Sequence, residues 1–145
     1  MDEEIKDINN EKGNTNKDRP TSDTPVDFKR RTIKFAISLI KFVESLPKNM
    51  VTEVIGKQVL RSGLSIGANF HAASRARSRA DYISKMKIVE EESDETLYWL
   101  EILVASHSVP FAKVEYLYTE CNELLSIIVA SIKTLKKSQN KTDGQ

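Results

Sequence analysis

The sequence predicts an all-α protein, an antiparallel up-down-up-down four-helix bundle, and three observations support this prediction. Apolar residues recur every three or four positions in four separate segments, which is the spacing of one face of an α-helix. The chain has only 5 Gly and 4 Pro in 145 residues, too few turn-forming residues for a β-rich fold. The connections between the four segments are short, and short connections make consecutive helices antiparallel neighbours.

The first predicted helix covers residues 27–46, with Asp27 as its candidate N-cap and Pro47 just beyond its end. Its apolar residues form two stripes. One stripe consists of Ile33, Ala36, Ile37, Ile40 and Val43, and the other consists of Phe28, Phe35, Leu39, Phe42 and Leu46. Two stripes are more apolar surface than one pair of neighbouring helices requires. We therefore expect part of this surface to contact something outside a single bundle.

The second predicted helix covers residues 50–74 and is unusually rich in small residues. Gly63 and Gly67 each cost about 1 kcal/mol of helix stability relative to Ala, so the close approach of another helix must compensate for them. Two explanations remain open at this point. The small residues either allow tight packing inside one subunit or form a contact between subunits.

The third and fourth predicted helices cover residues 79–107 and 110–137. Ser78 and Asp81 resemble a capping box at the start of the third helix. Its predicted inner stripe is Ile83, Met86, Glu90, Ser93, Leu97, Leu100 and Val104. In the fourth helix, Pro110 suits the first turn, and Lys133, Lys136 and Lys137 suit the last turn, where the helix dipole favours cations.

These helices form one predicted domain, residues 27–138, between a disordered acidic tail over 1–26 and a short disordered tail over 139–145. Residues 1–27 carry 4 basic and 8 acidic side chains, whereas residues 28–145 carry 18 basic and 13 acidic ones. A polar, acidic segment buries too little apolar surface to fold by itself. The chain shows no apolar run long enough to span a membrane and no secretory signal at its start, so we expect a cytoplasmic protein.

The residue types that catalysis would require are not arranged for it. Neither His71 nor His107 follows a Glu by three positions, as a di-iron bundle would need, and there is no Gly-rich phosphate loop. No Arg precedes either His at the spacing of helical ribonucleases that pair these residues. We therefore expect no enzyme, no metal and no cofactor. The single cysteine, Cys121, lies on the apolar stripe of the last helix and is expected to be a buried thiol.

The acidic run over residues 90–95 interrupts the inner stripe of the third helix. A buried carboxylate requires a cation or several hydrogen-bond donors. We predict a structural polar network of Arg61, Asn69 and Glu90 that fixes the register of the second and third helices. The alternative is a pair of carboxylates that serves catalysis or metal binding.

Basic residues concentrate in two places, and we predict that both contact nucleic acid. Lys29, Arg30 and Arg31 open the first helix, and Arg75, Arg77 and Arg79 surround the turn between the second and third helices. An antiparallel bundle brings these two groups to the same end, where they offer a phosphate-binding surface. The alternative is a solvated basic end that the acidic tail neutralises.

Several short motifs together resemble those of a known bacterial family. They are Arg61-Ser62-Gly63, Ser65-Ile66-Gly67-Ala68-Asn69, Arg75-Ala76-Arg77-Ser78, Asp94-Glu95 and Trp99-Leu100-Glu101. In these motifs the chain resembles, over about residues 28–137, the four-helix-bundle proteins encoded in intervening sequences of large-subunit ribosomal RNA genes. That family is related to the accessory variability protein of diversity-generating retroelements. The resemblance implies a homopentameric barrel without catalytic activity and, for the retroelement relatives, binding of RNA and of a reverse transcriptase.

The residues and the resemblance together favour one function. We expect a non-enzymatic, oligomeric helical bundle that binds RNA or a nucleic-acid-processing protein through its basic residues. The alternative is a protein–protein scaffold that has no contact with nucleic acid.

Overall fold

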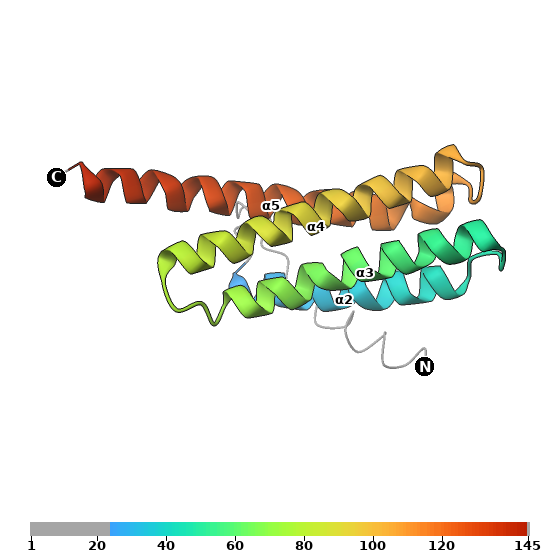
Figure 1. Cartoon of the computed structure of the whole chain (residues 1–145), viewed down its shortest axis with the longest axis horizontal. Coiled ribbons are helices and arrows are strands. Elements are labelled where there is room, and N and C mark those ends of the chain that lie inside the picture. The colour runs from blue at the N-terminus through green and yellow to red at the C-terminus, as the bar shows by residue number, and fades with distance from the viewer. Residues whose placement is uncertain (1–23, 145) are drawn as a thin grey trace, which may run out of the picture.

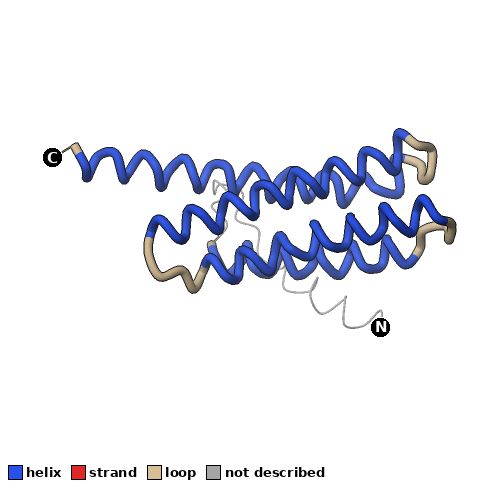
Figure 2. Tube along the Cα trace, viewed as in Figure 1, coloured by secondary structure: helices blue, strands red, loops and turns tan. Residues whose placement is uncertain are grey.

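The computed structural model of the chain describes residues 24–144, and these form an antiparallel bundle of four helices (Figure 1). The helices are α2 (Pro25–Glu44), α3 (Met50–Ala73), α4 (Arg79–Ala105) and α5 (Phe111–Asp143). Each helix packs against the next along the chain, and α5 returns to α2. Within the described residues only short turns join the helices, and there are no strands (Figure 2). The predicted fold class is confirmed.

The start of α2 differs from the prediction. Thr24, and not Asp27, is the N-cap, since its hydroxyl oxygen accepts a hydrogen bond from the Asp27 backbone N–H at 3.2 Å. Pro25 follows as the first helical residue, where a missing N–H costs nothing. The helix thus starts inside the segment predicted as the tail 1–26, most of which lies outside the described residues.

The end of α5 also differs. We predicted that the helix ends at 137 and that residues 139–145 form a tail, but α5 continues to Asp143. No Gly or Pro interrupts the segment before Gly144, so the backbone can remain helical up to that point. The C-terminal part of α5 extends past the turn between α3 and α4 (Figure 1).

Only one of the two apolar stripes of α2 belongs to the core. Phe28, Phe35, Leu39, Phe42 and Leu46 are buried. Of the other stripe, Ile33, Ile37 and Ile40 are 50%, 46% and 38% exposed. We call these three residues the α2 stripe. The expectation that one bundle leaves apolar surface of this helix uncovered is therefore confirmed.

Gly63 and Gly67 of α3 allow tight packing inside one subunit. This confirms the first of the two explanations given for the small residues of this helix. A Cβ atom added at Gly63 would lie 2.1 Å from Cδ2 of Leu39, and one at Gly67 would lie 3.0 Å from Oγ1 of Thr32. Both neighbours belong to α2 of the same chain. The close contact of α2 and α3 thus depends on the absence of these two side chains.

The predicted inner stripe of α4 is wrong at two positions. Val89 and Leu103 are fully buried, whereas Glu90 and Val104 are only half-buried. The helix is rotated so that it buries Val89 instead of Glu90, because a buried carboxylate would need a cation beside it.

The turn between α4 and α5 contains one residue in the left-handed region. His107 has a φ of 58°. Its backbone N–H donates to Val104 O at 3.0 Å, and the Ser108 N–H donates to Leu103 O at 3.0 Å. These two hydrogen bonds are the pattern of a Schellman motif. His107 occupies the left-handed position of that motif, which favours Gly. Both His107 and His71 are exposed.

Candidate nucleic-acid interface

The two predicted basic groups lie at the same end of the bundle. The Phe28 and Phe70 rings are 4.5 Å apart between centroids, so the start of α2 is held against the last turn of α3. Lys29 and Arg30 directly follow Phe28 and are exposed. Across this end, the turn between α3 and α4 presents Arg75 and Arg77, which are also exposed (Figure 1).

Arg79 joins the same end to α5. Its guanidinium donates to the Leu135 carbonyl at 3.0 Å and also contacts the Ser138 hydroxyl. These contacts place the start of α4 beside the C-terminal part of α5. We call Lys29, Arg30, Arg75, Arg77 and Arg79 the basic end.

The local carboxylates of this end are already engaged. Asp81 accepts hydrogen bonds from the Lys85 ammonium at 2.7 Å and from the Arg77 backbone N–H at 3.1 Å, and these lower its pKa. The Ser78 hydroxyl caps α4 through the Asp81 N–H, so the predicted capping is confirmed on the Ser78 side. The Asp81 carboxylate binds the Arg77 N–H, one residue before the group that a capping box would use. The Asp27 carboxylate accepts a hydrogen bond from the Thr24 hydroxyl at 2.6 Å.

Arg31, which we predicted as a nucleic-acid contact, bridges two helices. Its Nε lies 2.8 Å from Glu120 Oε1, and its Nη2 lies 2.6 Å from Glu123 Oε2. Its side chain is only 27% exposed. Its two carboxylate partners on α5 are far away along the sequence, so spacing alone could not reveal this bridge between α2 and α5.

The predicted network of Arg61, Asn69 and Glu90 does not form. Arg61 pairs with Glu92, at 3.3 Å between Nη1 and Oε2, and with Glu95. Asn69 donates to the Ser65 carbonyl of its own helix at 2.8 Å. Glu90 has no hydrogen bond or ion pair to any residue within 24–144. The α4 register explains the difference, because it turns Glu92 and Glu95 toward α3.

The pairing of Arg61 with Glu95 shifts the pKa values of both side chains. A hydrogen bond from Arg61, and a second one from the Trp99 indole N–H at 3.1 Å, lower the pKa of the Glu95 carboxyl. The same pairing with Glu95 raises the pKa of Arg61. These groups tie the exposed edge of α3 to α4, which is a structural role.

The buried polar link between α3 and α4 consists of residues that we did not single out as a pair. The Thr96 hydroxyl lies 3.0 Å from Ser62 Oγ, and both residues are fully buried. The Ser62 hydroxyl donates to the Gln58 carbonyl at 2.9 Å. Ser and Thr occur at both buried and exposed positions of helices, so the sequence alone does not show which of them are buried.

Cys121 is a buried thiol, as predicted. Its thiol donates a hydrogen bond to the Ser93 carbonyl oxygen, with 3.5 Å between Sγ and O. Burial, together with the nearby Asp94 and Glu120, raises the pKa of this thiol to about 12. Within residues 24–144, no group of three His, Cys, Asp or Glu side chains is arranged to hold a metal ion.

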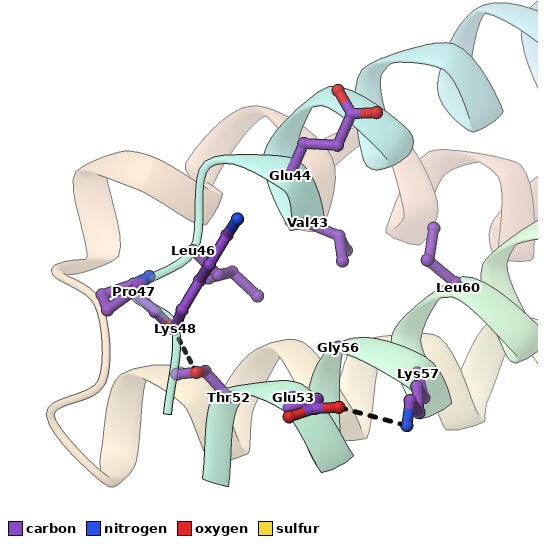
Figure 3. Close-up of a pocket in the computed structure, with 10 residues that line it drawn as sticks. All are labelled: Val43, Glu44, Leu46, Pro47, Lys48, Thr52, Glu53, Gly56, Lys57 and Leu60. Carbon is purple, nitrogen blue, oxygen red and sulfur yellow. Dashed lines mark hydrogen bonds and ion pairs between the residues drawn. The ribbon is translucent and has the colours of Figure 1, made fainter. Parts of the chain in front are cut away.

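A second surface lies at the opposite end of the bundle, where the end of α2 meets the start of α3. A groove of about 560 Å³ opens there between the two helices (Figure 3). Val43, Leu46 and Leu60 provide apolar walls, and Gly56 lies in the wall formed by α3. Val43 is the last residue of the apolar stripe of α2 that begins at Ile33. The groove therefore extends the apolar surface of α2 onto α3.

Four further cations lie beside the basic end, and we did not predict them as part of it. Lys133, Lys136, Lys137 and Lys141 are exposed on the C-terminal part of α5. We interpreted the first three only as complements to the helix dipole. Only Lys141 lies beyond the predicted end of the helix at 137, and its place on the same helix follows from the greater length of α5. None of the helices within 24–144 is both long and apolar enough to cross a membrane.

The chain is similar to a protein family and to solved structures. The model of the 23S rRNA-intervening sequence protein family matches residues 25–130. A crystal structure from Bacteroides thetaiotaomicron, described as a protein of unknown function from the S23 ribosomal protein family, matches at 34% identity with a TM-score of 0.70. The match covers 75% of this chain and 97% of that chain. The comparison with curated proteins gives no match. The fold, the matched residues and the identity to this relative show that the chain belongs to the 23S rRNA-intervening sequence protein family.

Proposed function

We propose that this protein is a non-enzymatic, oligomeric four-helix bundle that binds RNA, or a nucleoprotein, through its basic end. The observation that carries the proposal is the convergence of Lys29, Arg30, Arg75 and Arg77 from separate segments onto one exposed surface. Asp27 and Asp81, two carboxylates near these cations in the sequence, are engaged in local hydrogen bonds. The resemblance implies RNA binding for the retroelement relatives, which makes RNA the first ligand to test.

Phosphate binding at such a surface is driven by the release of counterions from the nucleic acid. The chain as a whole has a net charge of only +1, so the distribution of charge matters more than its total. Concentrating the cations at one end allows a nearly neutral protein to attract a polyanion locally.

The test replaces Arg75 and Arg77 together by Gln, and the matched control replaces Lys48 and Lys113, two exposed lysines of the opposite end. Arg79 stays unchanged because it contacts α5. In fluorescence anisotropy with a labelled RNA, we expect the Arg variant to bind more weakly and with a smaller salt slope. The control should bind as the parent does. Equal binding by both variants, or no binding by the parent at low salt, contradicts the proposal.

We propose further that copies of the chain associate through the α2 stripe and the groove beside it. The α2 stripe is an apolar surface that the bundle leaves exposed. Identical subunits usually cover such a surface by assembling with closed rotational symmetry. The family resemblance implies five copies.

The oligomer is tested by light scattering on the variant I33S/I37S. Its control is V51S/V54S, since Val51 and Val54 are 53% and 57% exposed but lie on α3 outside the α2 stripe. We expect only the stripe variant to lose mass toward the 16.4 kDa of one chain, with its helical circular dichroism retained. A stripe variant with the parent's mass contradicts this mode of association.

The alternative function is a scaffold that binds a protein and has no contact with nucleic acid, and the apolar groove between α2 and α3 favours it. A protein partner that remains bound after nuclease treatment would support the scaffold. Stoichiometric co-purification of a metal or a nucleotide would instead revive an enzymatic function.

A further inference from the structure

The C-terminal part of α5 is a basic arm that extends beyond the part of the chain shared with the family. The arm, residues 131–143, lies outside the residues that the family model matches. It contributes Ile132 to the core, and Arg79 of α4 anchors it through the Leu135 carbonyl. All its residues from Lys136 onward are exposed, so packing against the bundle does not account for them.

The arm carries four lysines and one carboxylate, that of Asp143 at its last residue. Between Leu124 and Thr142 the sequence has four lysines and no acidic residue. Lys133, Lys137 and Lys141 follow one another at intervals of four residues, which places them along one side of the helix. Like charges at this spacing repel one another, and none of the three forms an ion pair with a residue in the described part of the chain. A row of phosphates along the helix would relieve that repulsion.

The arm lacks the groups that bind unpaired bases, since residues 131–143 contain no aromatic residue and no Arg. Unpaired bases are generally bound by stacking on exposed aromatic rings. The exposed Phe and Tyr side chains within residues 24–144 are Tyr98, Phe111 and Tyr116, and by their positions in α4 and α5 these lie in the other half of the bundle. The exposed His71 ring belongs to the last turn of α3 and not to the arm. Tyr82, near the start of α4, is half-buried. The arm itself offers amide, hydroxyl and ammonium groups, which suit the phosphates and sugars of a double helix.

We propose that the basic arm, with Arg75 and Arg77 beside it, binds the phosphate backbone of double-helical nucleic acid without reading its sequence. This inference rests on the proposed function and makes it more specific, because it names the duplex as the ligand and α5 as part of the site. RNA and DNA duplexes share the chemistry, and the experiment separates them.

The test compares the full-length parent with K133Q/K137Q/K141Q and with the control K41Q/K48Q/K113Q, which removes the same charge from exposed positions away from the arm. Each protein is titrated into a fluorescein-labelled RNA duplex of about 16 base pairs, a length that suits shape-based recognition of duplex RNA. The same labelled strand unpaired and a DNA duplex of equal length are titrated in parallel. Far-UV circular dichroism verifies that α5 remains helical in each variant.

We expect the parent to prefer the RNA or DNA duplex over the single strand, and the arm variant to lose about tenfold or more in duplex affinity at moderate salt. Two to three lost phosphate contacts reduce the slope of log K against log salt by about 2 to 3. Duplex affinity of the arm variant equal to that of the control variant, or a parent that prefers the single strand, overturns the inference. If the arm variant binds normally while R75Q/R77Q does not, the proposed function survives and the arm proposal fails. If the parent binds no nucleic acid, both fail.

Discussion

Replacing Gly63 by Ala tests how closely α2 and α3 approach each other. An added Cβ would lie 2.1 Å from Cδ2 of Leu39, whereas ordinary contacts begin near 3.4 Å. Leu39 is fully buried in a close-packed core, and Phe35 lies 3.6 Å from the same added atom, so a movement of the leucine must displace other core side chains. Overpacking of a core costs about 1–3 kcal/mol, and this contact belongs at the upper end. The better helix propensity of Ala returns about 1 kcal/mol, so we expect a net loss of about 2 kcal/mol.

Gly56→Ala is the matched control, since it makes the same substitution in the same helix. Its added Cβ would lie 3.2 Å from Cγ1 of Val43, a half-buried side chain at the edge of the groove that can shift. We expect this variant to be as stable as the parent or up to about 1 kcal/mol more stable. Urea unfolding followed by far-UV circular dichroism gives both values, at one fixed protein concentration because the proposed self-association would add to stability.

A double variant separates the clash from a general intolerance of α3. Leu39→Ala alone should cost about 2–5 kcal/mol through the cavity it leaves. In Gly63→Ala/Leu39→Ala the new methyl enters that cavity, so the double variant should be less destabilised than the sum of the two single variants. Additive losses, or a Gly63→Ala variant at least as stable as Gly56→Ala, would refute the packing argument.

Three further predictions follow from the local chemistry of single residues. His107→Gly should stabilise the protein by up to about 1 kcal/mol, because Gly tolerates the φ of 58°; His71→Gly, inside α3, should destabilise it, and equal effects in thermal melts would contradict this. With its pKa raised to about 12, Cys121 should resist Ellman's reagent at pH 8 until the protein is unfolded in urea, and rapid labelling of the native protein would show that the thiol is accessible. The Glu95 pKa is lowered from an ordinary value of 4.5, so its contribution to stability is present above that pH and is lost as the pH falls through the folded value. The variant E95Q should therefore lose less stability than the parent between pH 6 and pH 3 in parallel urea titrations, whereas parallel curves would assign the acid sensitivity to other groups.

Much of the fold could be predicted from the sequence because helix-breaking residues separate four segments with helical periodicity. Pro47 and Pro110 lie in or beside two of the three turns, and Ser78 caps α4 as expected. The helix ends were less predictable. Thr24 and Pro25 together start α2 more favourably than Asp27 does, and residues 138–143 contain nothing that forces α5 to stop before Gly144.

The candidate site was predictable only where it depends on topology. An antiparallel bundle necessarily brings the start of α2 to the end of α3, so Lys29 and Arg75 could be placed at one end. The partners of individual charges could not be, since they depend on the rotation of each helix. Arg31 finds Glu120 on a distant helix, and Arg61 finds Glu92 in place of Glu90. Both differences arise from side-chain packing that residue spacing does not encode.

The most direct test of the whole account is the mass of the purified chain by light scattering, with absorbance at 260 nm recorded across the same peak at low and high salt. The account predicts a particle several times heavier than 16.4 kDa that carries nucleic acid at low salt and releases it at high salt while its mass as protein persists. A particle of a single chain at every concentration, without bound nucleic acid at low salt, would contradict it.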